Sequence, residues 1–236
     1  IAVIGLVPYI ALQLTAVSQS VATLVAHIDF ALMPGMQAPF RPDVPLTVAL
    51  SMAAFACLFG TRHIDSTEHQ SGLMLAVAAE SVIKLVALTA VGIYVLFVLF
   101  DGPVYLVDAV MANPVGSQMF TRGLSGGNWI VMSLLSFFAV LLLPRMFHVG
   151  VVENHTATEL KTARLMFPAY LVAINLFVVP IAMAGLVRYG TAIDADTYVL
   201  RLPLDAGAET FTLIAFIGGL SAATAMVIVA ALALAV

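Results

Sequence analysis

A glutamate and a lysine, Glu80 and Lys84, stand four residues apart inside the long apolar stretch 72–100. On a helix this spacing places both side chains on one face, and the order Glu then Lys is the favourable one. A lone charge inside a membrane is energetically costly, so we expect the two to pair and to face other helices. Two interpretations stay open: an element of an ion or solute pathway, or a structural lock between helices.

A run of small residues near the C-terminal end, 218–225, contains two hydroxyl side chains, Ser221 and Thr224. Small residues let membrane helices approach closely, and that packing role is the default interpretation. Ser221 and Thr224 lie about one helical turn apart, so they share a face. Hydroxyl oxygens are also ligands that hard cations prefer, so a sodium site is the second interpretation.

The polar segment 60–71 is dense in side chains that bind metals, namely His63, Asp65, Glu68 and His69. Their spacing matches no zinc pattern, and segments that link membrane spans are commonly polar. The better interpretation is that Asp65 and Glu68 cap the start of the next helix. Nucleotide-binding loops and nucleophile elbows are absent from the sequence, so we expect no catalytic site and no organic cofactor in this segment.

The elements that must position these residues are predicted to be membrane helices. Hydrophobic residues make up 62% of the 236 residues and charged residues only 9%, and the mean hydropathy is +1.10. A soluble domain would be about a quarter charged. The apolar runs are continuous, which favours an all-α polytopic bundle over a β-barrel. We expect one membrane domain with six spans, at approximately 1–26, 44–60, 72–100, 128–148, 163–187 and 209–236.

Several local features qualify these spans. The first is expected to break near Pro8, and the second is short for a full crossing. The connection 101–127 is long enough to hold a short interfacial helix.

The chain starts without methionine inside one apolar run and ends inside another. We therefore expect a fragment of a larger protein, with the bilayer and the remaining helices of that protein as partners. The net charge of −4 gives no reason to expect a nucleic-acid partner.

Three stretches of the sequence resemble one known family. They read GLVPYIALQLTAVS at 5–18, FGTRHID at 59–65 followed by ESVIK at 80–84, and FIGGLSAAT at 216–224. Together they resemble the membrane half of bacterial sensor histidine kinases whose N-terminal domain is a sodium/solute symporter homologue. Proline- and sugar-sodium symporters resemble the chain more loosely. The resemblance implies a LeuT-type fold of two inverted five-helix repeats, of which this chain would supply core helices three to eight.

The same resemblance implies roles for individual residues. The last span would be core helix eight, where symporters carry two adjacent hydroxyl residues at a sodium site. Thr224 matches the first position and Ala225 occupies the second, with Ser221 as a further oxygen. Asp65 matches an acidic residue on the cytoplasmic turn and would shape the ion exit. The span 128–148 matches the substrate-lining core helix six but lacks its glycines, and both departures favour a receptor-like role.

The expected function follows from this resemblance. The chain would be the transporter-like input domain of a sensor histidine kinase in a phosphorelay, sensing or moving a small organic solute such as an amino acid. The alternative is a stand-alone sodium/solute symporter, with Na⁺ as its coupling ion. Either protein would be a multi-pass protein of the bacterial inner membrane. We expect the long connections to be periplasmic and 61–71 to be cytoplasmic.

Overall fold

The computed structural model describes residues 2–32, 43–59, 71–121, 126–142 and 157–235. Every regular element within these ranges is a helix, which confirms the all-α prediction. The long helices are α1 (Ala2–Leu32), α2 (Val44–Phe59), α3 (Ser71–Tyr94), α6 (Gly126–Leu142), α8 (Ala157–Tyr189) and α10 (Glu209–Ala235). Shorter elements connect them: the π-helical turn η1 (Val95–Leu99), α4 (Pro103–Ala112), α5 (Pro114–Thr121), the 3-10 turn η3 (Ala195–Thr197) and α9 (Tyr198–Asp205).

Within the described residues, four helices are long and apolar enough to cross a membrane. Their spans are Leu6–Ile28, Leu75–Leu99, Leu160–Tyr189 and Glu209–Ala230. The helices α2 and α6 are also apolar but have 16 and 17 residues, about 24–26 Å of helix against a hydrocarbon core of about 30 Å. Large apolar side chains such as Leu75 and Leu165 are 72% and 77% exposed. Surfaces of this kind face lipid, and the chain is a multi-pass membrane protein.

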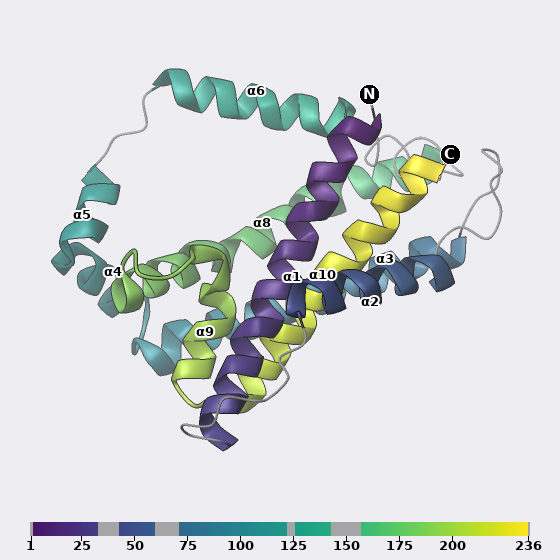
Figure 1. Ribbon diagram of the computed structural model, residues 1–236. Coiled ribbons are helices and arrows are strands. Elements are labelled where there is room, and N and C mark those ends of the chain that lie inside the picture. The colour runs from purple at the N-terminus through teal and green to yellow at the C-terminus, as the bar shows by residue number, and fades with distance from the viewer. Residues whose placement is uncertain (1, 33–42, 60–70, 122–125, 143–156, 236) are drawn as a thin grey trace.

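The centre of the bundle is the pair α3 and α10. Among the described elements, α10 packs most extensively against α3, and α1 runs beside α10 (Figure 1). A small cluster of buried side chains joins α1, α2 and α10, and it includes Val17, Met52 and Val227. A larger cluster joins α3, α4, α8 and α9, with Tyr94 of α3 stacked on Phe211 of α10. The two clusters hold α3 and α10 in fixed register with the helices around them.

Three glycines lie where a neighbouring helix packs so closely that a side chain at the glycine position would collide with it. A Cβ atom on Gly218 of α10 would overlap the Cβ of Ala87 on α3, and one on Gly92 of α3 would overlap the ring of Phe177 on α8. Gly185 of α8 meets the ring of Tyr198 in the same way. Glycine is what allows approach this close between membrane helices. The close-packing interpretation of the small residues is therefore realised at Gly218.

Some expectations about the helix ends were wrong. The first helix does not break near Pro8 but continues through it to Leu32, because a membrane helix tolerates the loss of one backbone hydrogen bond at proline. In contrast, the expectation that the connection 101–127 holds a short helix is confirmed, and the connection contains two, α4 and α5. The connection 188–205 is also largely structured, since it contains η3 and α9. The long helix α8 includes both of its prolines, Pro168 and Pro180.

The helix α6 stands apart from the bundle (Figure 1). Its described side chains from Gly126 to Phe138 are all exposed, and its sequence is apolar on every side. A helix of this composition is stable in lipid or against other apolar helices, not in water.

Candidate functional site

The carboxylate of Glu80 and the hydroxyl of Thr224 meet where α3 packs against α10, and Ser221 precedes Thr224 by about one turn of α10. Glu80 extends from the middle of α3, and the Oγ1 hydroxyl of Thr224 on α10 lies 3.4 Å from its Oε1 atom, within hydrogen-bonding reach. The same hydroxyl also lies 3.1 Å from the carbonyl oxygen of Leu220 and 2.9 Å from that of Ser221. A hydroxyl has one proton to donate, so these three acceptors share a single donor.

Two oxygens of this cluster have no hydrogen-bond partner among the described residues. They are Oε2 of Glu80 and Oγ of Ser221, and both atoms are shielded from solvent. Leaving a buried polar atom unsatisfied costs about 1–3 kcal/mol, and native proteins keep few such atoms. Carboxylate and hydroxyl oxygens are hard ligands that coordinate alkali cations, and they can also form hydrogen bonds with a bound water.

Lys84 lies one helical turn beyond Glu80 on α3. The two charges are close enough for Coulombic attraction between the ammonium and the carboxylate. That attraction offsets part of the free-energy cost of removing both charged groups from water. The structure thus brings together four residues that the sequence singled out as two separate pairs: Glu80 with Lys84, and Ser221 with Thr224.

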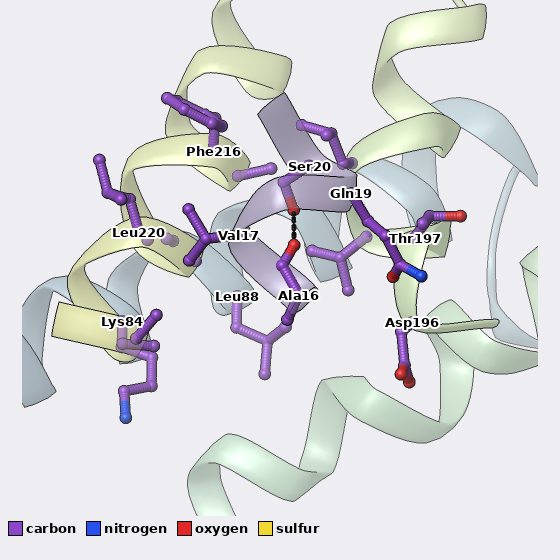
Figure 2. Close-up of a pocket in the computed structure, with 18 of the residues that line it drawn as sticks. Ala16, Val17, Gln19, Ser20, Lys84, Leu88, Asp196, Thr197, Phe216 and Leu220 are labelled. Atoms are coloured by element: carbon purple, nitrogen blue, oxygen red, sulfur yellow. Dashed lines mark hydrogen bonds between the residues drawn. The ribbon is translucent and has the colours of Figure 1, made fainter. Parts of the chain in front are cut away.

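A cavity of about 330 Å³ lies next to this cluster and shares Lys84 with it. Its walls come from α1, α3, α8, η3, α9 and α10. Apolar side chains make up much of the lining, among them Val17, Leu88, Phe216 and Leu220 (Figure 2). A mostly apolar cavity of this size with a few polar groups is typical of a site for a small molecule.

The polar groups of the cavity lie toward two ends. In Figure 2 Lys84 lies on one side, while Gln19, Asp196 and Thr197 gather on the other. The hydroxyl of Thr197 donates to the carbonyl oxygen of Asp194 at 2.7 Å, so its lone pairs remain available. The side-chain amides of Gln13 and Gln19 also line the cavity. The cavity therefore offers hydrogen-bond donors and acceptors to a ligand.

Other predicted site residues are not placed by the structure. Asp65 lies outside the described ranges, as do His63, Glu68 and His69, so both the metal and the helix-cap interpretations of the 60–71 segment stay predictions. Among the described residues, no group of three or more acidic, histidine or cysteine side chains is arranged to hold a metal ion.

Sequence reasoning missed several of the residues that line the cavity. Gln13 and Gln19 are polar residues inside the first apolar span, and that contrast was the available signal. Asp196 and Thr197 were assigned only to a connection. By resemblance the span 128–148 should line the solute site, but no residue of α6 lines this cavity.

Comparisons with known proteins add no relative. The chain matches no protein-family model, no curated protein and no solved structure.

Proposed function

We propose that this chain is the transporter-like membrane domain of a bacterial sensor histidine kinase, and that it binds a small organic solute within the inner membrane. One observation carries the proposal: a cavity of about 330 Å³ inside a bundle of apolar helices, beside an intramembrane carboxylate. Ionisable groups inside a membrane domain are expensive and commonly mark ion or solute pathways. A scaffold that only packed helices together would have no use for the cavity.

The sensor assignment is supported by the resemblance of 59–65, 80–84 and 216–224 to symporter-like sensor kinases. It is also supported by Ala225, which occupies the place of the second hydroxyl of a symporter sodium site. The LeuT-type arrangement with inverted repeats is part of this proposal. The sequence that follows Val236 provides a direct test. Further spans, then a dimerisation helix with a histidine and an ATP-binding domain, would support the sensor; a stop after the last span would contradict it.

The second candidate is a sodium/solute symporter, and a specific observation favours it. Oε2 of Glu80 and Oγ of Ser221 are buried without partners among the described residues, and the hydroxyl of Thr224 lies 3.4 Å from Oε1 of the same glutamate. A sodium ion bound there would be held by Thr224 and Ser221, with Asp65 on its exit path. Glu80 would supply the negative charge.

The experiment uses the full-length protein in proteoliposomes and measures binding and uptake of a panel of radiolabelled amino acids, with and without Na⁺. Thr224→Val keeps the side-chain shape and removes the hydroxyl. Its matched control is Thr212→Val, because the Thr212 hydroxyl also lies on α10 but donates only to the carbonyl of Ala208 at 3.1 Å.

Each result assigns the function differently. Solute binding without uptake supports the receptor. Sodium-dependent uptake that Thr224→Val abolishes and Thr212→Val preserves supports the symporter. Sodium dependence that survives Thr224→Val places the ion elsewhere. A protein that binds no solute in the panel contradicts both candidates.

A further inference from the structure

The two charged residues that line the cavity have opposite signs and lie at opposite ends of it. Lys84 belongs to α3 and Asp196 to the 3-10 turn η3. In Figure 2 both side chains extend toward the same side of the cavity, with Leu88 between them. A ligand lying across Leu88 would therefore meet a cation at one end and an anion at the other.

The separation of these charges restricts the ligand. Leu88 is one turn beyond Lys84 on the same helix, a rise of about 6 Å, and Asp196 lies on the far side of Leu88 in Figure 2. An α-amino acid carries its ammonium on the carbon next to its carboxylate, so it is poorly matched to two charges on opposite sides of Leu88. A solute with its charges at the two ends of a carbon chain can reach them, and the cavity volume of about 330 Å³ accommodates it.

The chemistry of the lining agrees with this division. The ammonium of Lys84 has three donors, so it can attract Glu80 and still donate to a ligand carboxylate. At the other end, Asp196 accepts hydrogen bonds from an ammonium, and the hydroxyl of Thr197 and the amide oxygen of Gln19 can accept too. Leu88 lies between them, and its side chain, like those of Val17 and Leu220 in the same lining, presents only apolar atoms, which suit a hydrocarbon chain.

We propose that the cavity binds an extended zwitterion, a solute of the ω-amino acid class. Lys84 holds its carboxylate, Asp196 holds its ammonium, and its carbon chain lies over Leu88. The inference rests on the proposed function, because it names the class of solute that the same cavity takes.

Five compounds with the same carbon count test the proposal on the full-length protein in lipid nanodiscs, by calorimetric titration. They are δ-aminovalerate, its isomer norvaline, pentanoate, pentylamine and pentanol. We expect δ-aminovalerate to bind about tenfold or more tightly than each of the others, because tenfold corresponds to about 1.4 kcal/mol, roughly the contribution of one hydrogen bond to a charged group. Norvaline is the decisive comparison, since it contains the same atoms with its charges side by side.

Two variants assign the ends of the ligand. Lys84→Gln should bring δ-aminovalerate down to the affinity of pentylamine and leave pentylamine unchanged. Asp196→Asn should bring it down to the affinity of pentanoate and leave pentanoate unchanged. Lys161→Gln and Asp108→Asn are matched controls, since both residues are exposed and neither lines the cavity. If Lys84→Gln fails to fold, Lys84→Arg keeps the positive charge and should keep the preference for δ-aminovalerate over norvaline. Asp196→Asn then tests the other end of the ligand independently.

The outcomes separate this inference from the proposed function. Equal or tighter binding of norvaline or pentanol overturns the extended zwitterion and leaves a solute-binding cavity. A protein that binds none of the five compounds but binds another solute of the amino-acid panel also overturns only the zwitterion. A protein that binds no solute at all overturns both.

Discussion

The close approach of α3 and α10 at Gly218 makes a quantitative prediction for Gly218→Ala. The added Cβ would overlap the Cβ of Ala87, where packed carbon atoms need about 3.5–4.0 Å. The two helices must then move apart or shift in register, and overpacking of this kind costs about 1–3 kcal/mol. Alanine also favours the helix over glycine by about 1 kcal/mol, which partly hides that penalty.

Gly219→Ala is the matched control, because the next residue on the same helix gains the same helix propensity. A Cβ on Gly219 meets nothing within 4 Å. The difference in free energy of unfolding between the two variants therefore isolates the overpacking, and we expect Gly218→Ala to be less stable than Gly219→Ala by about 1–3 kcal/mol. Denaturant titration of the purified protein in mixed micelles measures it.

A second substitution identifies the contact. Ala87→Gly removes the Cβ atom that the new alanine would strike, so the double variant should recover most of the loss, with a coupling energy of about 1–2 kcal/mol in the double-mutant cycle. Equal stability of Gly218→Ala and Gly219→Ala, or a cycle with no coupling, would refute the packing of α3 on α10 described above.

Three further predictions concern polar contacts. Glu80→Gln or Lys84→Met alone should destabilise the protein more than the double variant, because each single change leaves one buried charge without its partner. The same denaturant titration measures this, and a double variant as unstable as the worse single variant would argue against the pair. Tyr189→Phe removes a 2.7 Å hydrogen bond to Oδ2 of Asp205 and should lower the free energy of unfolding by about 1 kcal/mol, with no further loss in an Asp205→Ala background, where the acceptor is already absent. Asn113→Ala should also cost about 1 kcal/mol, because its side chain accepts from the backbone N–H of Val115 at 2.9 Å and caps α5; hydrogen exchange confined to α5 would report it.

The sequence was sufficient to predict an all-helical membrane protein and to single out Glu80 and Thr224. Long apolar runs indicate membrane helices, and a glutamate inside such a run is conspicuous. Of the six expected spans, four correspond to described helices long enough to cross a membrane, whereas α2 and α6 are shorter. The contact between Glu80 and Thr224 was not predictable, since 144 positions separate them. Helices such as α10 are apolar on all sides, so their hydrophobic pattern does not show which face packs against which neighbour.

The cavity was harder still to predict. It is formed by the packing of several helices, and its polar ends come from Gln19 within a span and Asp196 within a connection. A glutamine inside an apolar run is a weak signal, because one amide can be satisfied in many ways. An aspartate in a connection is ordinarily solvated. Only the tertiary arrangement shows that both face the same volume.

The position of Lys84 bears on the choice between a structural lock and a pathway for the Glu80–Lys84 pair. Lys84 attracts Glu80 and lines the cavity, so one ammonium serves the cluster and the cavity together. In the empty protein its charge compensates Glu80 and stabilises the packing of α3 on α10. A solute carboxylate bound as proposed would share that ammonium with Glu80, because an ammonium has three donors. The structural lock and the pathway are therefore compatible roles for one ion pair.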